Sequence, residues 1–109
     1  GIIGFIADLM PNWKKRHFKL KGALLTYHTS EGGKQEGAIA LTNEAKIHTE
    51  VDEKLHKEFK KPNQDVLIAF KEGAKELKLL IRFEDIKTKY HWADLMEDII
   101  EYLVTVKDN

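Results

Sequence analysis

The sequence contains no cysteine, which excludes disulfide bonds and a thiolate nucleophile and fits a reducing compartment. Long hydrophobic runs are also missing, since no segment approaches the roughly 18 apolar residues of a membrane-spanning helix. The apolar run at residues 2–7 is too short, and no basic residues precede it as they would in a signal peptide. The chain does not begin with Met, so we expect it to be part of a longer protein. Its 109 residues can bury one modest core, and we expect a single domain over 1–109.

Neither sign of charge predominates, because 18 basic residues balance 18 acidic ones. Their distribution is nevertheless uneven: residues 1–30 hold five basic residues and one acidic residue, whereas residues 84–109 hold three basic and seven acidic ones. Such a molecule orients in the field of an anionic surface, although two simply solvated faces would give the same pattern. Nucleic-acid binding needs an overall basic charge or aromatic platforms on an exposed sheet, so we expect no nucleic-acid partner.

Motifs of catalysis and metal binding are absent from the sequence. The five histidines (His17, His28, His48, His56 and His91) show no paired spacing with a nearby carboxylate. There is no glycine-rich phosphate loop, no nucleophile elbow and no Ser/His/Asp arrangement. We therefore expect neither an enzyme nor a bound metal or cofactor.

Residues 13–29 contain the most informative pattern. Phe18 and Leu20 alternate with basic residues, as in a strand with one buried and one solvated face. Lys21 and Gly22 provide a turn, and a second strand follows over 23–29. The pattern predicts a hairpin whose outer face carries a positive cluster, formed by Lys14, Lys15, Arg16, Lys19 and Lys21.

The rest of the chain predicts five further strands and a long helix. Apolar or alternating runs place the strands at 2–7, 38–41, 45–49, 66–70 and 76–83. From residue 85 the apolar period changes to three and four, which predicts an amphipathic helix over about 85–105 with Asp85 as its N-cap. Its apolar face is formed by Tyr90, Ala93, Met96, Ile99, Ile100, Leu103 and Val104, with Trp92 beside them.

A second, shorter helix is predicted between two of these strands, over about 51–61. Val51, Leu55 and Phe59 lie four residues apart among charged side chains, and Pro62 ends the run. We expect this helical insertion to cap an open edge of the sheet, and a partner-binding surface is the alternative.

Taken in order, these features resemble the pleckstrin homology (PH) family. The supporting positions are Gly4 and Ile6, the run from Trp13 to Leu20, Leu25 and Tyr27, the alternating Gly37, Ile39 and Leu41, and Trp92. The resemblance covers essentially the whole chain. It implies a mainly β fold, in which a strongly bent sheet or split barrel of seven antiparallel strands is capped by the C-terminal helix. It also implies a membrane-recruitment module that binds phospholipids.

The resemblance further implies a headgroup site at the first hairpin. Lys14 and Arg16 flank Lys15 on the second strand, as the family pattern requires, and Tyr27 keeps the position on the third strand. Clustered phosphates need several convergent charged donors, and these residues supply them.

Two positions depart from the family pattern. Where PH domains that bind polyphosphoinositides carry cations, this chain has Asp8 and Glu36. Both carboxylates repel phosphate, and Lys34 compensates in part. We therefore expect a monophosphate headgroup, such as phosphatidic acid or a phosphatidylinositol monophosphate. A solubilising, aggregation-resistant edge is the alternative role of the cations.

The tip of the first loop holds Leu9 and Met10 beside the cations. Apolar residues in such a place resemble an interfacial membrane anchor, although both side chains could equally fold back over the barrel mouth. We expect a monomeric domain that is cytoplasmic and peripheral to the membrane.

The rival hypothesis is a protein-interaction module with little lipid affinity. The 51–61 segment would carry that role, or the acidic face of the helix, formed by Asp94, Glu97, Asp98 and Glu101.

Overall fold

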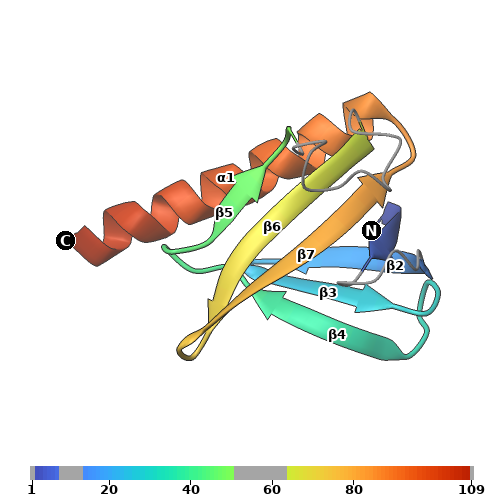
Figure 1. Ribbon diagram of the computed structural model, residues 1–109, viewed down its shortest axis with the longest axis horizontal. Helices are drawn as coiled ribbons and strands as arrows, with labels where there is room; N and C mark the ends of the chain where they lie inside the picture. The colour runs from blue at the N-terminus through green and yellow to red at the C-terminus, as the bar shows by residue number, and fades with distance from the viewer. Residues whose placement is uncertain (1, 8–13, 51–63, 109) are drawn as a thin grey trace.

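The computed structural model describes residues 2–7, 14–50 and 64–108, which form seven strands and one helix (Figure 1). The strands are β1 (Ile2–Ala7), β2 (Lys14–Lys21), β3 (Leu24–His28), β4 (Gln35–Ala40), β5 (Lys46–His48), β6 (Asp65–Glu72) and β7 (Lys75–Phe83), and the helix is α1 (Ile86–Asp108). The segments that hold Asp8, Leu9, Met10 and the predicted 51–61 helix lie outside the described residues.

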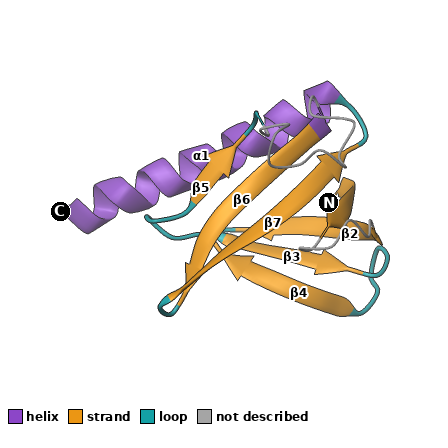
Figure 2. Ribbon diagram, viewed as in Figure 1, coloured by secondary structure: helices purple, strands orange, loops and turns teal. Residues whose placement is uncertain are grey.

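All seven strands belong to one antiparallel sheet with the order β4-β3-β2-β1-β7-β6-β5. β2, β3 and β4 cross the direction of β6 and β7, so the sheet is strongly bent, and α1 runs beside β5 and β6 (Figures 1 and 2). β4 and β5 are the two edges, and no described pairing joins them. The predicted class, a bent antiparallel sheet capped by a C-terminal helix, is confirmed.

Strand boundaries differ from the prediction mainly at the turns. The connection predicted over 71–75 is shorter, because β6 and β7 pair as far as Glu72 and Lys75. Gly73 in this turn has a φ of 64°, a left-handed conformation that glycine adopts without steric cost. β4 begins at Gln35, earlier than predicted, because backbone pairing with β3 extends beyond its apolar residues.

The hydrophobic core joins the two halves of the bent sheet through the helix. Phe18, Leu25, Ile39 and Leu41 contribute from the β2–β4 half, and Val66, Ile68, Leu79, Ile81 and Phe83 from the β6–β7 half. Trp92 and Met96 of α1 belong to the same cluster. Burying each of these large side chains contributes about 1.5–3 kcal/mol, so helix and sheet stabilise one another.

The helix begins at the predicted N-cap. The Thr88 backbone N–H donates to Asp85 Oδ1 at 2.7 Å, and this bond is the main reason that the pKa of Asp85 lies below its usual 3.8. At the other end α1 continues to Asp108, three residues beyond the predicted boundary. Among the described residues, no helix is both long enough and apolar enough to cross a membrane.

The predicted buried face of α1 is partly wrong. Tyr90 and Val104 are 44% and 40% exposed, whereas Lys89 is only 1% exposed. The buried stripe of the helix runs through Trp92, Ala93 and Met96. It lies to one side of the apolar face that the sequence spacing predicts. A charged residue thus takes a place that the sequence pattern gives to an apolar one.

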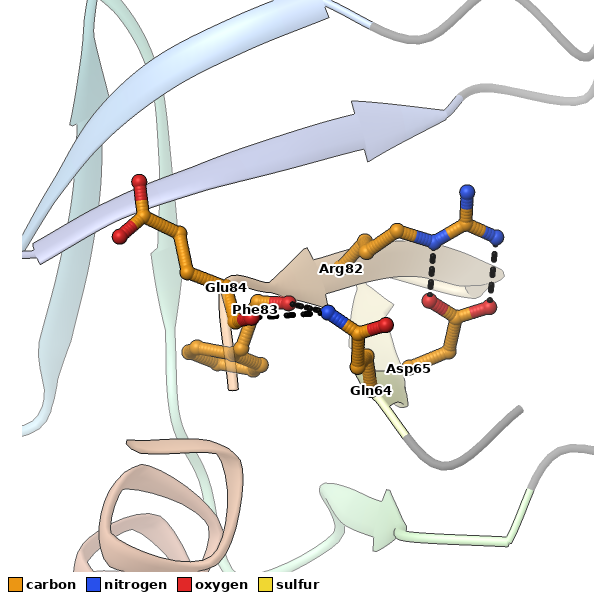
Figure 3. Close-up of polar contacts among 5 residues, drawn as sticks. All are labelled: Gln64, Asp65, Arg82, Phe83 and Glu84. Carbon is orange, nitrogen blue, oxygen red and sulfur yellow. Dashed lines mark hydrogen bonds and ion pairs between the residues drawn. The ribbon is translucent and has the colours of Figure 1, made fainter. Parts of the chain in front are cut away.

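A buried ion pair lies where β6 begins and β7 ends (Figure 3). Arg82 donates from Nε to Asp65 Oδ1 at 2.8 Å and from Nη2 to Oδ2 at 3.1 Å, and Asp65 is fully buried. Next to it, Gln64 Nε2 donates to the carbonyl oxygens of Phe83 and Glu84, both at 2.9 Å. These contacts hold the connection from β7 to the helix. Removing Arg82 would take this partner from the fully buried Asp65 carboxylate, and breaking a buried pair typically costs about 3–5 kcal/mol.

Lys89 offers a test of this buried polar region. Burial holds the pKa of Lys89 below its usual 10.5, against the opposing attraction of Asp65 and Glu50. The unfolded chain therefore binds more protons at this site than the folded one, so stability rises as pH rises toward 10.5. We expect the wild type to gain stability relative to Lys89→Met over that interval, measured by urea unfolding at several pH values. A difference that does not change with pH would contradict the desolvation of Lys89.

Candidate functional site

The candidate site is at the start of β2. Side chains alternate between the two sides of this strand, and this determines which cations lie on the same side. Phe18 is buried in the core, and side chains two residues apart lie on the same side of a strand. Lys14 and Arg16 therefore lie on the core side of β2, beyond the point where the core ends. Lys14 is exposed and Arg16 is half-buried.

The prediction of one outer face carrying all five cations is wrong. Lys15, Lys19 and Lys21 lie on the opposite side of β2, together with His17, which is 8% exposed. Successive side chains of a strand point to opposite sides, so a run of adjacent basic residues divides between the two sides. At the start of β2, this division leaves Lys14 and Arg16 together on the core side.

Tyr27 on β3 lies on the same side as these two residues, because its direct partner on β2 is Phe18. The Phe18 and Tyr27 rings have centroids 5.8 Å apart with a tilt of 40°, a favourable aromatic geometry. Arg16 is diagonal to Tyr27 across the strand pair, at a typical separation of about 7–8 Å. The structure thus brings Lys14, Arg16 and Tyr27 to one side of one strand end.

Gly37 explains how the Tyr27 ring fits there. The two residues are opposite each other in the β3–β4 pair. A Cβ atom on Gly37 would lie 2.2 Å from the Tyr27 hydroxyl oxygen and 2.3 Å from Cζ. The ring therefore crosses β4 at the one position that carries no side chain. The paired Gly37 and Tyr27 of the sequence pattern are a packing requirement.

Glu36 occupies a β-bulge. Tyr27 pairs with Gly37 and His28 pairs with Gln35, so Glu36 is the extra residue between two consecutive pairs. Its side chain is exposed. The sequence alone did not predict the bulge, because the run 35–37 carries no apolar alternation from which a change of register can be read.

The loop after β3 is held by His28. His28 Nδ1 lies 3.2 Å from the Gly33 carbonyl oxygen, so this nitrogen donates. His28 Nε2 lies 2.9 Å from the Thr26 hydroxyl oxygen. Both ring nitrogens thus have hydrogen-bond partners within the chain.

Lys34 lies at the end of the same loop. Its carbonyl oxygen accepts a hydrogen bond from the Thr29 N–H at 3.0 Å, which fixes the backbone, and its side chain is exposed. β2 and β3 are antiparallel, so this loop lies at the same end of the sheet as the start of β2 (Figure 1). The loop that holds Lys34 is therefore at the strand end that carries Lys14 and Arg16.

The chemistry that this arrangement permits is anion binding. Arg16 uses Nη1 to donate to the Lys15 carbonyl oxygen at 2.8 Å, and its guanidinium has further N–H donors. Lys14 adds a point charge on a flexible stem. Within the described residues, no group of three His, Cys, Asp or Glu side chains is placed to hold a metal ion.

Comparison with solved structures identifies the fold. The human PH domain of oxysterol binding protein-related protein 11 superposes with a TM-score of 0.70 and 20% sequence identity, over 95% of this chain and 81% of that one. No family model matches the sequence, and no curated protein matches it either. The chain thus has the PH fold that the sequence pattern predicts.

The fit between Gly37 and Tyr27 leads to a stability prediction. Gly37→Ala should destabilise the protein by about 1–3 kcal/mol, because the new methyl group forces the Tyr27 ring out of its place. In a Tyr27→Ala background the same change should be neutral or slightly stabilising, since alanine loses less entropy than glycine in a strand. Thermal or urea unfolding of the four proteins measures the coupling. Equal effects in both backgrounds would contradict the contact.

Proposed function

We propose that this domain binds an anionic phospholipid headgroup with a single phosphate and thereby recruits its host protein to membranes. The observation that carries the proposal is the separation of cations on β2, which leaves Lys14 and Arg16 together on one side of the strand start. The PH fold supports a binding module of this class. Phosphatidic acid and a phosphatidylinositol monophosphate are the two headgroups of this chemistry that we favour.

Each cation has a distinct task in this proposal. The planar Arg16 guanidinium pairs with two phosphate oxygens, and Lys14 neutralises remaining charge. Lys34 approaches from the β3–β4 loop and Tyr27 borders the site. Lys15, on the opposite side of β2, adds general attraction toward an anionic surface.

The carboxylates set the limit on phosphate number. Glu36 is exposed on the bulge beside Tyr27. A carboxylate about 5–8 Å from a phosphate repels it by roughly 0.5–1 kcal/mol at the dielectric of water. Each additional phosphate adds to that repulsion, so a headgroup with one phosphate is favoured. Asp8, which lies outside the described residues, is proposed to act in the same way.

Binding through one headgroup is weak, and a second contact with the bilayer would strengthen it. We propose that Leu9 and Met10, which also lie outside the described residues, insert at the membrane interface. In this arrangement the cations meet phosphate while the apolar tip enters the acyl boundary.

We expect vesicle binding to depend on which side of β2 a cation lies, and not only on the total positive charge of the strand. Lys14→Ala/Arg16→Ala should abolish sedimentation with phosphatidylcholine vesicles that contain phosphatidic acid, at physiological salt. The matched control is Lys15→Ala/Lys19→Ala, which removes the same charge from the opposite side of β2 and should retain most of the binding. Each charge-assisted hydrogen bond contributes about 1.5–3 kcal/mol, so the first variant loses tenfold or more. Equal losses would mean that only overall charge matters.

A second prediction concerns headgroup selection. Glu36→Lys should increase affinity for a soluble inositol bisphosphate, because it replaces repulsion by attraction beside the proposed site. Glu31→Lys makes the same change of charge at an exposed position elsewhere in the β3–β4 loop and should have a smaller effect. Titration calorimetry measures both. If Glu36→Lys gave no gain over the control, Glu36 would not border the site.

A further inference from the structure

A long apolar groove lies away from the proposed lipid site. It runs between the β2–β3 turn and the C-terminal half of α1 and has a volume of about 1020 Å³. Leu20 and Ala23 form its sheet wall, and Trp92, Leu95, Ile99 and Tyr102 form its helix wall. The groove begins at the far end of β2 from Lys14, about 20 Å along the strand at 3.3 Å per residue. Both places can therefore be occupied at once.

The helix wall is exposed because α1 is longer than the sheet beneath it. Its 23 residues span about 35 Å, and its C-terminal end projects beyond β5 (Figure 1). Leu95, Tyr102 and Val106 are 41%, 66% and 49% exposed. Large apolar side chains gathered on one face of a projecting helix indicate an interaction surface.

The spacing of these residues indicates the shape of the occupant. Beyond the buried Trp92, the residues Leu95, Ile99, Tyr102 and Val106 are separated by four, three and four residues. This 3-4 repeat is the seam along which one α-helix packs against another in a coiled coil. An extended peptide gains nothing from such a spacing, whereas a second helix interdigitates with it.

The charges at the groove walls indicate the chemistry of the occupant. Lys19, Leu20 and Lys21 all line the groove where β2 ends, so residues from both sides of the strand reach it there. Lys19 and Lys21 are exposed at this wall, and Asp98 is exposed on the helix side. Among the described residues these three side chains have no ion pair. The groove therefore has one positive wall and one negative wall. A complementary helix carries acidic residues on one flank and basic residues on the other.

We propose that this groove binds an amphipathic α-helix of a partner protein, with an apolar 3-4 stripe between an acidic and a basic flank. The acidic flank faces Lys19 and Lys21, and the basic flank faces Asp98. A second copy of this chain fits less well. Its α1 would bring Asp94, Asp98 and Glu101 toward the same acidic residues of the first copy, and like charges would face each other.

Three synthetic helical peptides of about 21 residues, three heptads each, test the proposal. All share a leucine 3-4 stripe; one has an acidic and a basic flank, one has two acidic flanks and one has two basic flanks. Fluorescence anisotropy with the whole chain should show the mixed peptide binding about tenfold tighter than either control, since each control places like charges against one wall. Because the peptide is free to choose its direction, the comparison does not depend on its orientation.

Variants then place the peptide in the groove. Tyr102→Asp should weaken binding about tenfold or more, as loss of an aromatic anchor does. Val104→Asp is the matched control, because Val104 is 40% exposed on the same helix but does not line the groove. Lys19→Glu/Lys21→Glu should reverse the preference toward the peptide with two basic flanks. Lys14→Ala/Arg16→Ala should leave peptide binding unchanged.

Four results would overturn the proposal. Two concern the peptides: none of them binds, or all three bind equally. The third is an equal effect of Tyr102→Asp and Val104→Asp on binding. The fourth is self-association of the chain that Tyr102→Asp abolishes. The last result, measured by sedimentation equilibrium, would assign the groove to a second copy.

Discussion

Phe18 is 1% exposed, and its burial sets the register of β2 against the strands on either side. A slip by one residue would turn Phe18 to the opposite side and bring charged Lys19 toward the core. Apolar side chains from both halves of the sheet belong to the same core cluster as this residue and Trp92. The position of every cation on β2 follows from that register. Core packing and candidate ligand chemistry are thus two consequences of one alternating strand.

The two ends of β2 carry different surfaces for the same reason. At its start, Lys14 and Arg16 lie on the same side of the strand as Phe18, but beyond the last buried side chain. Their charged groups can therefore reach solvent there. At its end, Leu20 continues the same side into the groove beneath α1. The core therefore separates the proposed headgroup site from the apolar groove by about 20 Å along β2.

Sequence periodicity predicted the elements because most strands contain an apolar or alternating run and the C-terminal helix has an apolar period of three and four. The hairpin around Gly22, the strand through Leu79 and Ile81, and the helix that follows the N-cap Asp85 are confirmed. The buried face of α1 was less predictable, since Tyr90 and Val104 share its helical period yet are exposed. The sheet covers only one part of a wide apolar stripe on the helix. The sequence does not say how the helix is rotated about its axis against the sheet. The headgroup contacts themselves remain a prediction.

By itself the sequence determined the order of the seven strands and the C-terminal helix, and the PH resemblance, because these depend on local period and turn chemistry. Only the tertiary structure brought Tyr27 to the same side as Lys14 and Arg16, since that requires the register of β2 against β3. It also decided that Gly37 lies beneath the Tyr27 ring and that Lys89 is buried near Asp65. These contacts join residues distant in the chain, and no local pattern encodes them. The groove between α1 and the β2–β3 turn exists for the same reason, because its two walls are about 80 residues apart and meet only through the shared core.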